Sequence, residues 1–126
     1  MAAEALAAAG DLARDGIDAE VIDLRSLKPW DLDTVLASVR KTGGAVIADP
    51  GWKTAGAAAE IAATISEEAF DDLRAPPVRV TLPDAPAPAN PAEERGYYPG
   101  SAEIADAARR VMRKRRGSGE RKGAAA

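Results

Sequence analysis

The 126-residue chain carries a net charge of −3 and contains neither cysteine nor histidine. Disulfides, thiolate metal sites and cysteine nucleophiles are therefore excluded, as is the commonest general base and metal ligand, histidine. No apolar run approaches the roughly 18 residues that a transmembrane helix needs, and the N-terminal segment lacks the basic start of a signal peptide. We expect a cytoplasmic protein whose length fits one domain.

The first third of the chain predicts a helix followed by a strand. Residues 2–14 are rich in alanine and leucine at helical spacing, and Gly16 is well placed to end the helix. Residues 17–27 form an apolar run with β-branched side chains, which is typical of a strand. Asp23 and Arg25 share one face of that strand. We interpret them as an ion pair, and we do not expect Asp23 to be a catalytic carboxylate.

The middle of the chain predicts two further helices and two further strands. Asp31 is a natural N-cap for a helix that ends at Gly43. Short apolar runs at residues 45–48 and 78–82 predict buried strands, and the small side chains between them predict a helix over about 55–73.

The last third of the chain is divided between a proline-rich segment, a helix and a basic end. Residues 83–100 hold five of the nine prolines, so we expect an extended surface strap, anchored to the body by Tyr97 and Tyr98. Ser101 then begins a last helix. Residues 113–126 have no apolar content to bury and are expected to be a disordered basic tail.

The alternation of helices and strands favours an α/β fold. We expect a three-layer α/β/α sandwich with a mainly parallel sheet, formed by residues 1–112. One feature of the order is unusual, because the chain begins on a helix, whereas a βαβ architecture has a strand before it.

The loop after the second predicted strand has the layout of a phosphate-binding loop. Gly51 and Gly56 have the separation of the two P-loop glycines, but alanines stand where that motif has its lysine and hydroxyl residue. The glycine pair of the dinucleotide-binding fingerprint is also missing. We therefore interpret the loop as a weak anion site or a contact surface for another domain or subunit. This candidate contact loop comprises Asp49, Pro50, Gly51, Trp52, Lys53 and Gly56.

Three motifs stand in order along the chain: VIDLRSLKPWD, AVIADPGWKTAGAAAEIAA, and VTLPDAPAPANP with a following YYP. Together they resemble the C-terminal, transketolase-like domain of the beta subunit of thiamine-diphosphate-dependent 2-oxo acid dehydrogenases, the pyruvate, acetoin and branched-chain type. The resemblance covers residues 1–112.

The resemblance implies a division of labour. In that family the thiamine diphosphate, its magnesium ion and the catalytic histidine of the beta subunit are expected outside this domain. The C-terminal domain serves subunit association and helps dock the dihydrolipoyl acyltransferase core. The resemblance thus implies no catalytic, cofactor-binding or metal-binding residue in this chain. The implied partners are the dehydrogenase alpha subunit, the remainder of the beta subunit and the acyltransferase core.

The sequence departs from the family pattern in two places. Pro50 stands where the family has an acid, and the family's domain has strands ahead of the helix at residues 2–14. We therefore expect an N-terminally truncated domain that lacks a central strand between residues 17–27 and 45–48. Such a sheet leaves backbone groups unpaired or forces the flanking strands to pair directly. We expect the isolated chain to be marginally stable until a partner or a preceding segment supplies the strand.

The charge distribution suggests an alternative function. From Arg109 onward there are eight Arg or Lys residues and one acid, which leaves −10 on the first 108 residues. A free-standing interaction module whose basic tail binds an anionic partner such as nucleic acid is therefore the alternative. The tail has no aromatic side chains to stack on bases, so binding to nucleic acid is disfavoured.

Overall fold

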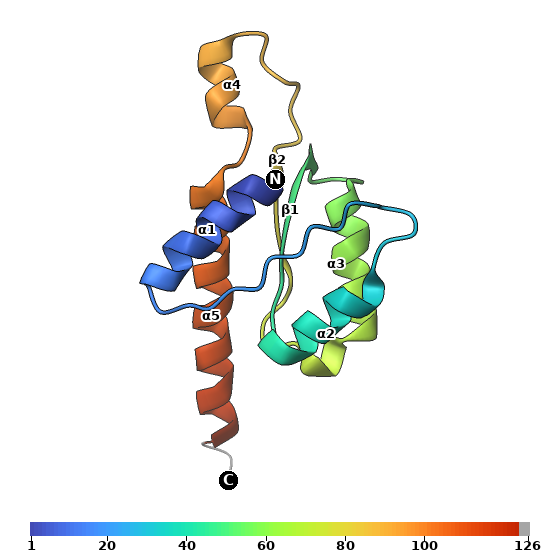
Figure 1. Ribbon diagram of the computed structural model, residues 1–126, viewed down its shortest axis with the longest axis vertical. Helices are drawn as coiled ribbons and strands as arrows, with labels where there is room; N and C mark the ends of the chain where they lie inside the picture. The colour runs from blue at the N-terminus through green and yellow to red at the C-terminus, as the bar shows by residue number, and fades with distance from the viewer. Residues whose placement is uncertain (124–126) are drawn as a thin grey trace.

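A computed structural model describes residues 1–123, with all side chains except those of Arg95 and residues 114–123. Figure 1 shows a small sheet between two helical layers, with α1 and α5 on one side and α2 and α3 on the other. The fold is therefore α/β with the three layers predicted from the sequence. The elements are α1 (Ala2–Arg14), α2 (Leu32–Thr42), β1 (Val46–Trp52), α3 (Ala57–Glu68), a 3-10 turn (Phe70–Asp72), β2 (Val78–Leu82), α4 (Pro91–Tyr97) and α5 (Ser101–Gly123).

Two hydrophobic cores hold the layers together, one on each face of the sheet. The core under α1 and α5 contains Leu12, Val80 and Ile104, all of them buried. The core under α2 and α3 contains Leu36 and Ile65, and Trp30 packs against it. Because successive strand residues point to opposite faces, Val80 belongs to the first core while Ile47 of β1 packs against the second.

The sheet described by the structure consists of β1 and β2 in parallel. Val46 is paired with Val78, and the Val78 N–H donates to the Ala45 carbonyl over 3.0 Å. In such a ladder the N–H and C=O of one residue point to the same side, and the side alternates along the strand. Each strand consequently keeps one edge that faces away from its partner.

The ends of α2 follow the sequence prediction. Asp31 accepts a hydrogen bond from the Thr34 N–H over 3.0 Å, which caps the first turn of the helix. Hydrogen bonds from the Thr34 hydroxyl and from this N–H lower the pKa of Asp31 below its ordinary value. At the other end Gly43 adopts a left-handed conformation with φ of 75°, which glycine accommodates without strain.

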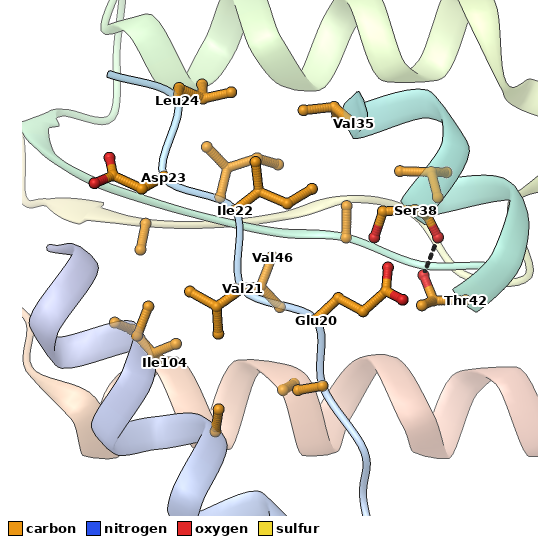
Figure 2. A pocket seen from close by; sticks show the side chains of 18 of the residues that line it. Glu20, Val21, Ile22, Asp23, Leu24, Val35, Ser38, Thr42, Val46 and Ile104 are labelled. Atoms are coloured by element: carbon orange, nitrogen blue, oxygen red, sulfur yellow. Dashed lines mark hydrogen bonds between the residues drawn. The ribbon is translucent and has the colours of Figure 1, made fainter. Parts of the chain in front are cut away.

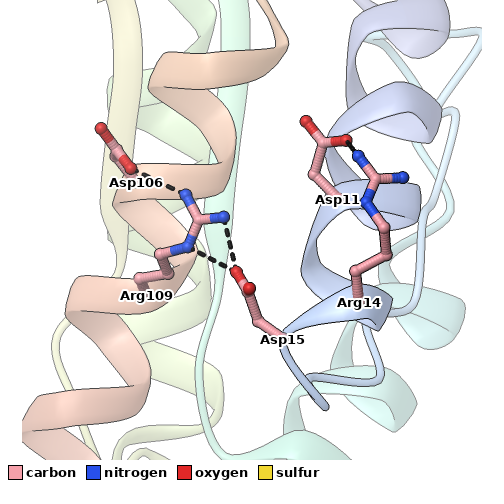
Figure 3. A network of polar contacts seen from close by, with 5 residues as sticks. All are labelled: Asp11, Arg14, Asp15, Asp106 and Arg109. Atoms are coloured by element: carbon pink, nitrogen blue, oxygen red, sulfur yellow. Dashed lines mark hydrogen bonds and ion pairs between the residues drawn. The ribbon is translucent and has the colours of Figure 1, made fainter.

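Helices α1 and α5 are fastened to each other by a polar network at the C-terminal end of α1 (Figure 3). The Arg109 guanidinium on α5 donates to the Asp15 carboxylate over 2.6 and 2.9 Å and to Asp106 over 2.9 Å. These contacts raise the pKa of Arg109, chiefly through the Asp15 hydrogen bond. The network fixes where the chain leaves α1 and starts its path across the sheet.

The prediction of a strand at residues 17–27 is wrong. This segment is extended but pairs with no strand, and it crosses the front of the sheet on its way from α1 to α2 (Figure 1). Within the described residues no backbone hydrogen bond joins it to β1. Its Asp23–Arg25 ion pair forms as predicted, with 2.7 Å between the charged atoms, and is exposed. An apolar β-branched run does not become a strand unless a neighbouring strand completes its ladder.

Two predictions about the last third of the chain need correction. The strap at residues 83–100 is not extended throughout, because Pro91–Tyr97 forms the short helix α4. Asn90 caps that helix by accepting from the Ala92 N–H over 2.9 Å, and Pro91 occupies its first turn, where no backbone donor is needed. The tail expected to be disordered from residue 113 is helical as far as Gly123. Residues 124–126 of that tail lie outside the described part of the chain.

Candidate interaction site

The first four residues of the predicted contact loop, Asp49 to Trp52, belong to the end of β1. The loop is organised around the carboxylate of Asp49. One of its oxygens accepts from the Gly51 N–H over 2.9 Å, and the other accepts from the Ala58 N–H over 3.1 Å. The second bond satisfies a free donor in the first turn of α3, whose N-cap residue Gly56 has no side chain to do so. Asp49 therefore joins the end of β1, the loop and the start of α3.

Gly56 is required by space. A Cβ atom built on Gly56 would lie 2.1 Å from the backbone carbonyl oxygen of Trp52, which is far inside van der Waals contact. A Cβ on Gly51 would lie 3.1 Å from both Asp49 carboxylate oxygens, which is tight but can be relieved by a small shift. The glycine spacing that resembled a P-loop thus serves a close turn of the backbone around Asp49.

The loop is tied to the proline-rich strap by side chains that are distant in sequence. Asp84 accepts from the Thr54 N–H over 3.0 Å and from its hydroxyl over 2.6 Å. The Tyr97 hydroxyl donates to the Ala85 carbonyl over 2.6 Å and accepts from the Trp52 indole N–H over 3.2 Å. The structure therefore brings the predicted loop residue Trp52 and the predicted strap residue Tyr97 together.

The other predicted site residues are placed at the surface around this junction. Pro50 and Lys53 are exposed, and Trp52 remains 57% exposed despite its hydrogen bond. Tyr98 packs edge-on against Tyr97 with 5.4 Å between ring centroids, yet it is 47% exposed. The surface is therefore aromatic and basic.

The Thr54–Asp84 contact has an electrostatic signature. The Thr54 hydroxyl and then its N–H lower the pKa of Asp84 below the ordinary value, and the positive charges of Lys53 and Arg79 lower it further. The carboxylate is thus held in its charged form. It acts as a clamp between loop and strap.

A second feature lies along the free edge of β1. Val46 and Ala48 direct their N–H and C=O groups away from β2, because Ala45 and Ile47 take part in the ladder with it. A cleft of about 420 Å³ opens there, between the extended segment at residues 17–25 and β1, and side chains of both helical layers line it. Figure 2 shows Ile22 on the side of the cleft where Val35 lies and Val21 on the side where Ile104 lies, with Val46 between them.

The segment that covers the cleft is held by side-chain contacts, since Ile17 packs against one core and Leu24 against the other. Glu20 pairs with Lys41 of α2, and hydrogen bonds from Lys41 and then Ser38 lower the pKa of Glu20. Ile22 remains 36% exposed although it is one of the apolar residues that line the cleft. The segment thus covers apolar surface without forming a sheet contact.

Sequence reasoning missed the capping role of Asp49 and the contact made by Asp84. Asp49 was noted as part of the loop, but nothing local indicates that it caps a helix eight to nine residues later. The partnership of Thr54 with Asp84 spans 30 residues and has no sequence signal. The two glycines were a usable signal, because their spacing marked a tight turn even though the phosphate interpretation was disfavoured.

The layers, the parallel ladder and the loop at the carboxyl end of β1 define the class of the chain as a small parallel α/β/α domain. The family described as "Transketolase, C-terminal domain" matches residues 1–104, and the chain belongs to this family. The resemblance inferred from the three sequence motifs is therefore confirmed.

Curated relatives are beta subunits of 2-oxo acid dehydrogenases and of a related oxidoreductase. The pyruvate dehydrogenase E1 component subunit beta of Bacillus subtilis (strain 168) is 43% identical over 112 residues, which are 89% of this chain and 34% of the relative. The acetoin:2,6-dichlorophenolindophenol oxidoreductase subunit beta of Cupriavidus necator is 43% identical over 113 residues, covering 90% of this chain and 33% of the relative. The 2-oxoisovalerate dehydrogenase subunit beta of Pseudomonas aeruginosa is 50% identical over 97 residues, covering 77% of this chain and 27% of the relative.

A solved structure has the same fold. The split gene transketolase, inactive beta4 tetramer, superposes with a TM-score of 0.78 at 29% sequence identity, covering 90% of this chain and 37% of that chain. This chain therefore spans about a third of the relatives that it matches, and it corresponds to the C-terminal domain of 2-oxo acid dehydrogenase beta subunits.

Two kinds of feature are absent from the described residues. None of the helices there combines the length and the apolar character needed to cross a bilayer. No group of three or more acidic side chains in this part of the chain is arranged to hold a metal ion.

Proposed function

We propose that this chain is the non-catalytic C-terminal domain of a 2-oxo acid dehydrogenase beta subunit, and that it acts in subunit association and in docking the acyltransferase core. The parent reaction is the oxidative decarboxylation of a 2-oxo acid with transfer of the acyl group to a lipoyl group. Thiamine diphosphate and magnesium belong to the remainder of the enzyme, together with the alpha subunit.

The observation that carries the association role is the free edge of β1. Val46 and Ala48 offer N–H and C=O groups to a cleft whose walls are apolar and come from both helical layers. Unpaired backbone groups in apolar surroundings are costly, and a strand inserted there satisfies them while it buries the walls. We assign this edge to a strand from the remainder of the beta subunit.

The exposed loop supports the docking role. Trp52 and Tyr98 expose 57% and 47% of their surface, and Lys53 lies beside them. Tryptophan and tyrosine are enriched in protein interfaces. Because the Asp49 bonds and the Thr54–Asp84 clamp hold the loop in one conformation, a partner that binds it does not have to order it first.

Co-purification tests the association role. The chain, carrying an affinity tag, is co-expressed with an alpha subunit and with the first two thirds of a beta subunit whose own C-terminal domain has been removed. We expect the three polypeptides to purify together and to regain 2-oxo acid decarboxylation, which neither the chain nor the truncated subunits perform alone.

Two proline substitutions provide the matched comparison. Ala48→Pro removes an N–H that faces the β1 cleft, and Thr81→Pro removes an N–H on the opposite edge of the sheet, while the ladder between the strands keeps all its donors in both variants. Association should be lost with Ala48→Pro and kept with Thr81→Pro, both variants being folded by circular dichroism. Equal association of the two variants would refute the assignment of the β1 edge.

A further inference from the structure

The outer edge of β2 is a second open edge, and its surroundings differ from those of the first. Val78 and Val80 take part in the ladder with β1, so the N–H and C=O groups of Arg79 and Thr81 point outward. No backbone hydrogen bond to Arg79 or Thr81 from outside the ladder is formed within the described residues. This edge therefore presents two donors and two acceptors.

A groove of about 720 Å³ runs along this edge. It is lined by residues 79–82 of β2 and by residues 96–99 of the strap. One wall is a single face of α5, because its lining residues recur at helical spacing. These α5 residues are Glu103, Asp106, Arg110 and Arg113.

The two acidic side chains of the groove already form contacts within the chain. Glu103 accepts from the Gly100 N–H over 2.9 Å, and Asp106 pairs with Arg109 over 2.9 Å. Their negative charge is thus partly compensated by contacts inside the chain.

The cations of the groove form no ion pairs of this kind, although the Asp84 carboxylate interacts with the charges of Lys53 and Arg79. Lys53, Arg79, Arg110 and Arg113 all line it, and none of them forms a salt bridge with a described residue. Arg79 donates to the Lys53 carbonyl over 2.7 Å, which orients its guanidinium without neutralising it. The groove therefore carries an excess of positive charge beside an open strand edge.

We propose that this groove binds an extended acidic segment of a partner protein, which adds to β2 as a further strand. An extended backbone matches the outward N–H and C=O groups of Arg79 and Thr81, and carboxylates match the four cations. A second copy of this chain fits poorly, because pairing two β2 edges would bring cations against cations. A nucleic acid supplies phosphate acceptors but no regular row of alternating N–H and C=O groups at strand spacing to match the two outward carbonyls. This inference does not depend on the proposed function.

Peptide binding to the full chain tests the proposal. The probe is a fluorescein-labelled ten-residue peptide that alternates glutamate with valine or threonine, and the comparison peptide has lysine in place of each glutamate. We expect the acidic peptide to bind at least tenfold more tightly in fluorescence anisotropy and to slow amide hydrogen exchange at Arg79 and Thr81. A single-stranded RNA of equal charge should bind without slowing exchange at those two amides.

Two variants separate the contributions of backbone and charge. Thr81→Pro should abolish binding of the acidic peptide, whereas Ala48→Pro should leave it unchanged. If Thr81→Pro does not fold, the double variant Arg110→Glu with Arg113→Glu replaces it, and it should weaken binding roughly tenfold, as expected for two exposed charge pairs. Its matched control is Arg14→Glu with Lys28→Glu, which makes the same change in net charge away from the groove.

Three results would overturn the proposal. They are equal affinity for the acidic and basic peptides, peptide binding without protection of Arg79 and Thr81, and tighter binding of RNA than of the acidic peptide. The association measured with the remainder of the beta subunit is unaffected by any of them, so failure here is distinguishable from failure of the proposed function.

Discussion

The two edges of the sheet present the same backbone pattern in opposite surroundings. At β1, Val46 and Ala48 face an apolar cleft that lies between both helical layers. At β2, Arg79 and Thr81 face a groove lined by arginines, a lysine and two acids. The backbone alone does not decide what an edge binds, and the side chains that border it make the difference.

The difference indicates two kinds of partner. A strand between two helical layers is buried on both faces and is apolar along its length, as in parallel sheets generally. Its loss exposes both cores, so it belongs to a permanent association. A charged groove on the outer edge can bind a segment and release it without exposing a core, and salt should weaken that binding. The β1 edge is therefore assigned to assembly and the β2 edge to reversible docking.

The largest effect is expected from supplying a strand to the β1 cleft. Met1 lines the cleft, so a five-residue Val/Ile strand with a short glycine-containing connector can be fused directly ahead of it. We expect the isolated chain to melt below about 45 °C and the fusion to melt at least about 10 °C higher, because the strand satisfies an open edge and buries apolar walls.

The control for this fusion carries aspartate at two of the strand positions and has the same length. Differential scanning calorimetry measures both proteins. A cooperative transition of the unfused chain well above about 45 °C would contradict this expectation, because the β1 edge would then be tolerated without a partner.

The next largest effect is expected on stability, from a substitution in the contact loop between β1 and α3. Gly56→Ala should lower the free energy of unfolding by about 1–3 kcal/mol, since the added Cβ would lie 2.1 Å from the Trp52 carbonyl oxygen. Gly96→Ala is the matched control, because a Cβ there meets nothing within 4 Å and alanine favours the helix. Urea denaturation compares them, and equal stability of the two variants would contradict the steric account.

The same loop should affect the two edges unequally. It carries Lys53, which lines the β2 groove but not the β1 cleft. Lys53→Glu should weaken binding of the acidic peptide several-fold and leave co-purification with the remainder of the beta subunit unchanged. Loss of co-purification would show that the two surfaces are coupled rather than separate.

The smallest effect is expected from lowering the pH. The pKa of Asp84 is lower in the folded chain than in the unfolded one, so its contribution is complete above the unfolded pKa of about 3.9 and disappears as pH falls through the lower folded value. Below about pH 4 the clamp to Thr54 should loosen. In a Trp30→Phe background, the fluorescence of Trp52 should change over this range, and Asp84→Asn should shift or remove the change.

The sequence was sufficient to predict what depends on local patterns. The capping of α2 by Asp31 and Gly43, the helix at residues 2–14 and the two strands flanking α3 all follow from spacing and turn chemistry. The family followed from three motifs in order. These features need no information about distant partners.

What could not be predicted depends on contacts between distant residues. Residues 17–27 have the composition of a strand, but a strand is defined by its ladder, and none forms there within the described residues. The helix at Pro91–Tyr97 was hidden because prolines suggested an extended strap, although Asn90 and Pro91 are typical of a helix start. The contrast between the two sheet edges appears only when α5 and the strap are placed beside β2.

Amide hydrogen exchange tests the central claim most directly. The exchange rates of Val46 and Ala48 are measured in the isolated chain and in the complex with the alpha subunit and the remainder of the beta subunit, with Arg79 and Thr81 as internal controls. The account predicts that complex formation slows exchange at Val46 and Ala48 by orders of magnitude and leaves Arg79 and Thr81 unchanged. A stable complex in which Val46 and Ala48 exchange as fast as in the isolated chain would contradict it.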